Sequence, residues 1–238
     1  MDRVLIVTGG SRGIGAATVR LAARSGYRVC FTFLRDAEAA QAIAGETNSL
    51  ALPCDVSVEA DIVRVFEAVN RELGAPYALV NNAATLEPQM RVEQMTADRL
   101  HRMFAVNVIG TILCCREAIL RMRSGGAIVN VSSGAAKYGS PGEYVDYAAT
   151  KGAIDTFTIG LAKEVAAQGI RVNAVRPGFI HTDLHAKGGE PDRVTRLASS
   201  VPMQRGGRPE EVAEGILWLL SDAASYITGT TLDIAGGR

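Results

Sequence analysis

Short apolar runs alternate with longer amphipathic segments along the chain, and this alternation limits the fold more than any other feature of the sequence. A strand that is apolar throughout has to be buried on both faces, as strands are in a parallel sheet that helices cover. The segment after one such run shows helical spacing, with apolar residues at Ile154, Phe157, Leu161 and Val165. The pattern therefore predicts an α/β fold, a doubly wound parallel sheet of seven strands with helices on both faces.

Seven runs are predicted to be strands of one domain that covers residues 1–238. They are Val4–Val7, Val29–Phe33, Leu50–Cys54, Ala78–Val80, Ala127–Val131, Arg171–Val175 and Thr231–Ile234. A chain of 238 residues can bury one large core without exceeding the size of a single domain. The segment Thr182–Arg208 breaks the alternation, and the glycines and prolines near both of its ends predict a loop beside a substrate.

The charge balance excludes several classes of partner. The chain carries 25 basic and 25 acidic side chains, so it offers no electrostatic footprint for nucleic acid or for an anionic membrane. We expect no apolar stretch long enough to span a membrane, and the apolar run at the N-terminus is too short for a signal peptide. The four cysteines lack CxxC or framework spacing, which predicts free thiols and a cytoplasmic location.

The first predicted strand ends in a glycine-rich turn, Thr8–Gly15, and a helical pattern starts directly after it. Glycines allow a tight turn and a close backbone approach, and the N-terminus of the following helix can receive a pyrophosphate. Glycine-rich turns also serve as purely structural connections. The strand before this turn and the helix after it favour a dinucleotide site.

The choice between NADP and NAD depends on the end of the second predicted strand. NAD sites carry an acidic residue there for the ribose hydroxyls, whereas this chain has none near Phe33. Arg12 and Arg35 could bracket a 2′-phosphate instead, which favours NADP. Both arginines could equally be solvated, and Asp36 could weaken a phosphate site or reach a ribose, so NAD stays open.

Tyr147 and Lys151 are four residues apart, which places them on one face of a helix, one turn from each other. An ammonium so close favours a phenolate, so we expect the pKa of Tyr147 to fall below its ordinary value of about 10. Tyr147 could then exchange a proton with a carbonyl or alcohol oxygen at neutral pH. The pair alone fits a surface tyrosine packed on a lysine stem. The glycine-rich turn is what favours the catalytic interpretation.

These motifs occur together in an order that resembles the short-chain dehydrogenase/reductase family over the full length of the chain. The matching elements are Thr8–Gly15, Asp55-Val56, Asn81–Ala84, Asn107, Ser133, Tyr147 with Lys151, and Pro177-Gly178 with Thr182. Within the family, the chain is most similar to bacterial NADP-preferring reductases of the oxoacyl-carrier-protein reductase and glucose dehydrogenase type. The resemblance implies the Rossmann fold and hydride transfer with NAD(P).

The resemblance also implies a role for each matching residue. The implied catalytic residues are Ser133, Tyr147, Lys151 and Asn107. Tyr147 would exchange the proton, and Lys151 would lower its pKa and hold the nicotinamide ribose. Ser133 would bind the substrate oxygen, and Asn107 would hold a water in the proton relay. The implied cofactor-binding residues are Gly9, Ser11, Arg12, Gly13, Ile14, Gly15, Arg35, Asp55, Val56, Asn82, Ala83, Tyr147, Lys151, Pro177, Gly178, Ile180 and Thr182.

The chain departs from the family pattern at two places. Ala84 stands where the family usually has glycine, and its methyl group would crowd the cofactor if the backbone there needs a positive φ. Ser133 lies one residue further from Tyr147 than is most common, so Ser132 is a rival for its role. Tyr144 is a rival tyrosine, but residue 148 is alanine, so it has no lysine partner four residues on.

The remaining candidate residues have simpler interpretations. His181 and His185 are four residues apart, but no further ligands lie nearby, so we predict no metal site. Cys114 and Cys115 are expected to be small core residues. The resemblance implies a homotetramer, with a homodimer as the alternative, and the long apolar segment Leu100–Met122 could form a subunit interface.

The sequence therefore predicts an oxidoreductase that interconverts a carbonyl compound and an alcohol with NADP(H). The alternative from another class is an NAD(P)-binding sensor without turnover, although a sensor does not need a full catalytic set. A dehydration or epimerisation that retains the cofactor is a third hypothesis. The pocket is predicted to be lined by the loop after Ser133, by Leu86–Met90 and by Thr182–Arg208. Their mixed residues, such as Val145, Leu184, Lys187, Met203 and Arg205, suit sugars, acyl thioesters and aromatic ketones equally.

Overall fold

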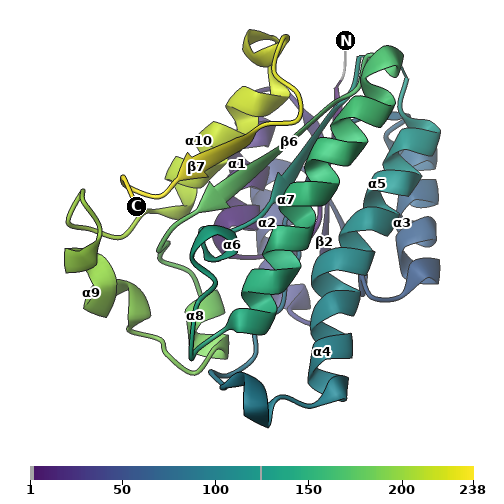
Figure 1. The fold of residues 1–238 in the computed structure, drawn as a ribbon. Helices are drawn as coiled ribbons and strands as arrows, with labels where there is room; N and C mark the ends of the chain where they lie inside the picture. Colours follow the sequence, from purple (N-terminus) through teal and green to yellow (C-terminus); the bar gives the residue numbers. More distant parts are fainter. Residues whose placement is uncertain (1–2, 124) are drawn as a thin grey trace.

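The computed structural model describes residues 3–123 and 125–238, and its centre is a sheet of seven parallel strands (Figure 1). The strands are β1 Val4–Val7, β2 Arg28–Phe33, β3 Leu50–Pro53, β4 Pro76–Asn81, β5 Ala127–Val131, β6 Arg171–Pro177 and β7 Thr231–Ile234. Their order across the sheet is β3-β2-β1-β4-β5-β6-β7. The predicted seven-stranded, doubly wound sheet is confirmed, and each predicted strand coincides with an observed one to within two residues at either end.

Helices cover both faces of the sheet. They are α1 Gly13–Arg24, α2 Ala37–Thr47, α3 Glu59–Glu72, α4 Ala97–Phe104, α5 Gly110–Arg121, α6 Ala135–Tyr138, α7 Val145–Val165, α8 Leu184–Lys187, α9 Arg193–Leu197 and α10 Pro209–Leu220. In Figure 1, α3, α5 and α7 stand side by side in front of the sheet, while α1, α2 and α10 lie behind it. Contacts between α1 and α10 and between α3 and α5 hold each layer together.

The core explains why the strands are apolar on both faces. In β1, Leu5 and Val7 pack into the cluster that includes α1, α2 and α10 residues. Val4 and Ile6 of the same strand pack into the opposite cluster, with residues of α3, α5 and α7. All four side chains are at most 2% exposed. Because successive side chains of a strand point to opposite faces, an unbroken apolar run is what a sheet with two covered faces needs.

The strand order creates a crevice at one edge of the sheet. The chain moves outward from β1 to β2 and β3, and then returns to place β4 on the other side of β1. The connections after β1 and β4 therefore leave in opposite directions and open a gap at the carboxyl ends of these two strands, where ligands bind in sheets of this type. The glycine-rich turn follows β1 directly, so it lies at this gap.

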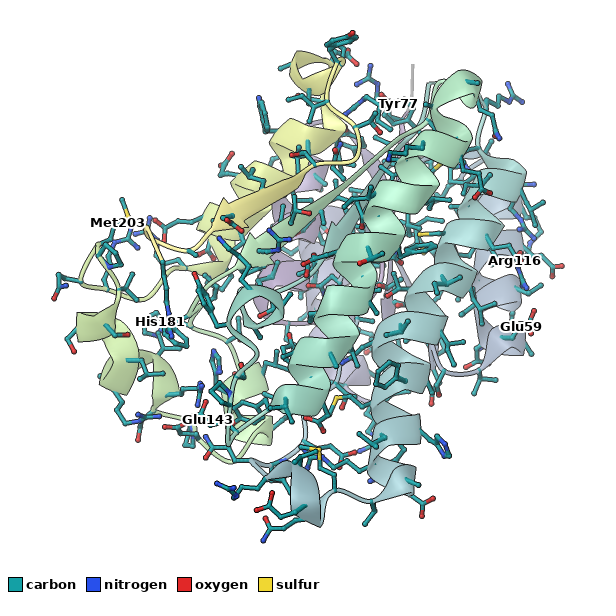
Figure 2. The ribbon with its side chains drawn as sticks, viewed as in Figure 1. Glu59, Tyr77, Arg116, Glu143, His181 and Met203 are labelled. Atoms are coloured by element: carbon teal, nitrogen blue, oxygen red, sulfur yellow. The ribbon has the colours of Figure 1, made fainter. Side chains whose placement is uncertain are left out.

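The expectation that no apolar stretch is long enough to span a membrane is wrong by length and composition. A π-helical segment, Ala105–Ile109, joins α4 to α5, and the continuous helix Ala97–Arg121 is long and apolar enough to cross a membrane by length and composition alone. This helix is nevertheless part of the layer in front of the sheet. Residues of α5 contact α3, residues of α4 contact α7, and an ion pair of 2.7 Å joins Arg116 of α5 to Glu59 of α3 (Figure 2).

The segment Thr182–Arg208 leaves the body of the domain and returns to the same place. A bridge pairs Ile180 with Gly207, and the His181 amide donates to Gly207 O at 3.0 Å. Between these ends the chain forms α8, α9 and a short 3-10 turn, Ala198–Ser200. These elements lie beside α6 at the carboxyl edge of the sheet (Figure 1). The predicted substrate loop is thus a folded excursion, which we call the lid.

Candidate active site

The glycine-rich turn leaves no room for a side chain at Gly15. A Cβ atom on Gly15 would lie 2.2 Å from Gly9 O and 2.6 Å from Asn82 Nδ2, so only glycine fits there. The helix that follows, α1, is described in full, has no acidic residue in its first turn and makes no side-chain cap at Arg12. Its first backbone N–H groups can therefore donate to an anion. The turn fits the pyrophosphate of a dinucleotide.

Hydrogen bonds fasten this turn to the end of β4. Thr8 Oγ1 accepts from the amides of Asn82 and Ala83, each at 3.0 Å, and Asn82 Nδ2 donates to Gly9 O at 2.9 Å. These bonds keep the gap between β1 and β4 at a fixed width. The backbone of Ala84 meets no special demand, since the positive φ angles of the described non-glycine residues occur at Asn48, Ser140 and Gln204. The condition under which Ala84 would crowd a cofactor is therefore not met.

A cavity of about 360 Å³ opens beside the turn. It brings together residues that are far apart in the sequence. The predicted site residues on its wall are Ile14, Asn82, Ser133, Tyr147, Lys151, Pro177, Gly178, Ile180 and Thr182. The other predicted site residues lie outside this wall, and they are Gly9, Ser11, Arg12, Gly13, Gly15, Arg35, Asp55, Val56, Ala83 and Asn107.

Tyr147 lies in the first turn of α7 and is buried. Burial raises the pKa of Tyr147 to about 12, and a hydrogen bond with Ser133 offsets this only in part. The expectation that the pKa of Tyr147 falls below its ordinary value of 10 is therefore wrong. The Lys151 ammonium lies 5.5 Å from the centre of the Tyr147 ring, and the dominant effect on the phenol is the loss of water around it.

Lys151 is held by the sheet. Its Nζ donates to Val131 O, the last residue of β5, at 2.7 Å. Burial lowers the pKa of Lys151 to about 8, against a smaller opposite effect of Asp155. An ammonium whose pKa lies near working pH, next to a buried phenol, is typical of an active site.

The hydrogen bonds distinguish Ser133 from its rival Ser132. Ser132 is 2% exposed, and its hydroxyl donates to Lys151 O at 3.2 Å, which turns it into the packing between β5 and α7. Ser133 Oγ accepts from the amide of Ala135 at 3.1 Å, and its hydroxyl is near enough to Tyr147 to act on the pKa of the phenol. Of the two serines, Ser133 is therefore the one whose hydroxyl contacts the tyrosine.

Asn107 links elements that surround the site. It lies in the π-helical segment, where a local widening of the helix often marks a functional site. Its Nδ2 donates to Thr85 O at 3.0 Å and to Thr150 Oγ1 at 3.2 Å, and its Oδ1 accepts from the Thr85 amide at 2.8 Å. Thr150 in turn donates to Tyr147 O at 2.7 Å. The side chain thus joins the loop after β4 to α7.

A buried ion pair at the start of α7 was not predicted from the sequence. Arg99 Nε donates to Asp146 Oδ2 at 2.7 Å, and the two side chains are 4% and 0% exposed. Asp146 Oδ1 accepts from the Tyr147 amide at 2.8 Å, while Arg99 Nη1 donates to Pro88 O at 2.8 Å. The pair connects α4, the loop after β4 and α7. Nothing in the spacing of Arg99 distinguishes it from a surface residue of an amphipathic helix.

The far side of the glycine turn carries a group of charges. Arg12 Nη2 lies 3.6 Å from Asp36 Oδ2, and Asp36 also caps α2 by accepting from the Ala39 amide at 3.1 Å. Arg35 is exposed. Burial lowers the pKa of Lys187 in the lid, and the nearby charges of Arg12 and Arg35 lower it further. The carboxylate of Asp183 acts on Lys187 in the opposite sense, so three cations gather here with the two carboxylates of Asp36 and Asp183.

The walls of the cavity differ from those that the sequence suggested. Leu184 lines it as expected, but Val145, Lys187, Met203 and Arg205 do not. Each of the three predicted segments nevertheless contributes to the wall, through residues such as Leu86, Tyr138 and Arg193. Phe179, Ala235 and Arg238 lie outside these segments, and no local pattern marks a residue that becomes part of a pocket wall through long-range packing.

Known proteins resemble this chain in both sequence and fold. A family model described as enoyl-(acyl carrier protein) reductase matches residues 9–238. The chain is 55% identical over 245 residues to the uncharacterized oxidoreductase YgfF of Escherichia coli, with 99% of each chain covered. It is 40% identical over 241 residues to the human 3-oxoacyl-(acyl-carrier-protein) reductase, covering 100% of this chain and 98% of that protein.

A solved structure extends the comparison. The short-chain dehydrogenase from Burkholderia cenocepacia, in complex with NADP, has a TM-score of 0.92 at 31% identity, with 99% of this chain and 97% of that chain covered. A parallel sheet with a glycine turn at its switch point defines the class of Rossmann-type dinucleotide-binding proteins. The chain belongs to the short-chain dehydrogenase/reductase family and is an oxidoreductase of that family.

Replacement of Lys151 by methionine is expected to stabilise the protein near pH 7. The pKa of the folded state, about 8, lies below the ordinary lysine value of 10.5, so the folded state holds a charge that burial disfavours. Removal of this charge should raise the free energy of unfolding by about 1–3 kcal/mol. The gain should shrink between pH 8 and pH 10.5, where wild-type Lys151 loses its proton on folding.

Urea unfolding at several pH values measures this effect. The control is Lys163→Met, which removes an exposed ammonium from the same helix and should change stability little at any pH. A Lys151→Met protein that is less stable than the wild type near pH 7, or whose difference does not depend on pH, would contradict the argument.

Proposed function

We propose that this protein is an NADP(H)-dependent oxidoreductase that interconverts a carbonyl compound and an alcohol, with Tyr147 as the general acid and base. The observation that carries the proposal is the set of Ser133, Tyr147 and Lys151, of which Tyr147 and Lys151 are buried, on the wall of a cavity that also touches the glycine turn at Ile14. A phenol, a hydroxyl and an ammonium within reach of one another form a proton-transfer site. A sensor without turnover has no need of such a set.

The nicotinamide, when bound, supplies the hydride. Asn82, Pro177, Gly178, Ile180 and Thr182 line the cavity together with Ile14 of the glycine turn and would hold the nicotinamide end. Pro177 is the last residue of β6, and the amide of the next residue, Gly178, donates to Ile234 O at 3.0 Å. This backbone is therefore fixed by its neighbour strand, which gives one face of the ring a rigid support.

Tyr147 moves the proton in this proposal. With a pKa of about 12, its hydroxyl is protonated at neutral pH and can donate to a carbonyl oxygen as negative charge develops there. Ser133 provides a second hydroxyl at the same oxygen. Lys151 is the nearest cation to the phenol, and its charge favours the phenolate that remains after the proton has left. Burial keeps bulk water away from Tyr147 and Lys151.

The preference for NADP rests on the cations beyond the glycine turn. Arg12, Arg35 and Lys187 outnumber the two carboxylates of Asp36 and Asp183, which leaves net positive charge for a 2′-phosphate. The end of β2 carries no acid at Phe33 to bind a ribose hydroxyl. Two relatives in fold support the same choice, since they were solved with NADP and with NADPH.

Tyr147→Phe should lower the rate of carbonyl reduction by about a hundredfold to ten-thousandfold, because it removes the proton donor. Binding of NADPH, followed by nicotinamide fluorescence, should change little. The matched control is Tyr144→Phe, whose hydroxyl donates to Gly188 O at 3.0 Å and is thereby occupied. An equal loss in both variants would contradict the assignment, and tight NADPH binding without turnover of any carbonyl compound by the wild type would favour the sensor.

Substitutions beyond the turn test cofactor selectivity. Arg12→Leu and Arg35→Leu should each weaken NADPH binding by about tenfold and leave NADH binding unchanged, because only NADPH has the extra phosphate. Asp36→Asn should strengthen NADPH binding, since it removes the carboxylate beside Arg12 while asparagine can still cap α2. Fluorescence titration with both cofactors measures this. Equal effects on NADH would contradict the phosphate site.

We also propose that the protein is a homotetramer in the cytoplasm. Ile109, Ile112 and Leu120 are 51%, 38% and 71% exposed on one face of the long helix, and they suit an interface with a second copy. Trp218 on α10 and Tyr226 give a second exposed apolar region, as a tetramer needs. The cytoplasmic location is supported by four cysteines that are all free and buried.

Sedimentation velocity tests the assembly. The wild type is expected to sediment as a tetramer, and Leu120→Glu should shift it to a smaller species because the charge would be buried against a partner. Leu34→Glu, at a site 56% exposed away from the long helix, is the control and should leave the assembly unchanged. A wild-type monomer at micromolar concentration would rule the tetramer out.

A further inference from the structure

The cavity has a second end that the proton-transfer residues do not use. Part of its wall comes from Phe179, Tyr138 and the C-terminal segment Ala235–Arg238. This segment reaches the cavity because β7 runs beside β6 and ends at the same edge of the sheet. A Cβ atom on Gly178 would lie 2.9 Å from Ala235 Cα, so the two backbones are in direct contact at this point.

The chain turns sharply after β7 and brings Arg238 back over the cavity. Gly236 and Gly237 have φ angles of +64° and +92°, a region that side chains disfavour. Residues near the end of the lid hold this turn in place. The Met203 amide donates to Gly236 O at 3.1 Å, and Pro202 packs against Gly237. The position of Arg238 is thus fixed by the backbone and by the end of the lid.

The Arg238 guanidinium lies against two aromatic rings. Its Cζ is 4.4 Å from the centre of the Phe179 ring and 5.1 Å from that of Tyr138. The Tyr138 ring in turn lies 3.4 Å from the position of a Cβ atom on Gly134, the neighbour of Ser133. One ring therefore separates the guanidinium from the backbone beside the catalytic serine. A guanidinium packed on aromatic rings keeps N–H groups free at its edge for an anion.

The other arginine of this wall is already neutralised. Arg193 forms ion pairs with Glu143 and, at 2.7 Å, with Glu190, and its side chain is 8% exposed. Figure 2 shows Glu143 near the start of α7, below the lid residue His181. Among residues 3–123 and 125–238, no carboxylate forms an ion pair with Arg238. Arg238 is accordingly the guanidinium on this wall that is available to a ligand.

The wall of the cavity is mainly aromatic and aliphatic. Tyr138, Tyr144, Phe179, Leu86 and Leu184 line it, beside the polar side chains of Ser140, Glu143, His185 and Arg193. Such walls favour a flat or branched apolar body over a sugar, whose hydroxyls would lose hydrogen bonds with water. A ligand that spans the cavity would thus meet hydroxyl donors at one end, apolar walls along its length and a cation at the other end.

We propose that Arg238, stacked on Phe179 and Tyr138, binds a carboxylate at the far end of the substrate, so that the preferred substrates are apolar or aromatic carbonyl compounds that carry an anionic group. This inference rests on the proposed function, because it assigns a substrate class to the same cavity. It makes Arg238 a determinant of specificity that acts on binding, apart from the proton transfer at Tyr147.

Two aldehydes of matched shape test the subsite with NADPH as the cofactor. 4-Formylbenzoate carries the carboxylate, and its methyl ester is the neutral counterpart. The wild type should prefer the acid by about tenfold in kcat/KM, through a lower KM. Arg238→Met should remove this preference and leave the ester unaffected, and Arg238→Lys should retain part of it. Arg71→Met, which removes an exposed arginine from α3, is the control and should behave as the wild type.

The outcomes separate this inference from the proposed function. Turnover of both aldehydes without a preference for the acid would overturn the anion subsite and leave the oxidoreductase standing. A preference that survives in Arg238→Met would place the anion site elsewhere and would also overturn the inference. If the wild type turned over neither of these aldehydes nor any other carbonyl compound offered, both proposals would be overturned.

Discussion

The burial of the Lys151 ammonium is the interaction on which the site depends. Its bond of 2.7 Å to Val131 O fastens α7 to the end of β5, one helical turn from Tyr147. Ser133 follows Val131 by two residues, so the same contact brings serine and tyrosine together. Burial disfavours this charge and lowers the pKa of Lys151 to about 8. A charge kept under such conditions is characteristic of function, since a neutral side chain would serve packing better.

The cavity gains its shape from segments that lie far apart in the chain. Hydrogen bonds of Thr8 and Asn82 fix the gap between β1 and β4, the buried pair of Arg99 and Asp146 fixes the start of α7, and the lid returns to the body at Gly207. The ends of the strands and the start of α7 thus hold Asn82, Ser133 and Tyr147 in place, while the lid and the C-terminal turn complete the cavity wall. Different members of one fold can change substrate through these two segments without disturbing the sheet.

The strands and the position of the glycine turn followed from local patterns, because burial on both faces leaves an unbroken apolar run such as Val4–Val7. The prediction for the pKa of Tyr147 failed for a specific reason. The spacing to Lys151 shows that the two residues share a helix face, but it does not show that both are buried or that the ammonium bonds Val131. Desolvation then outweighs the attraction between ammonium and phenolate.

The sequence by itself determined the fold class, the dinucleotide turn and the order of Ser133, Tyr147 and Lys151, since each depends on residue types at short, fixed spacing. The tertiary structure decided the rest. It turned Ser132 into the core and Ser133 towards Tyr147, and it built the cavity wall from Phe179, Arg193 and Arg238. Such contacts join residues that are separated by tens of positions, so they arise from packing, and the burial that sets the pKa values arises with them.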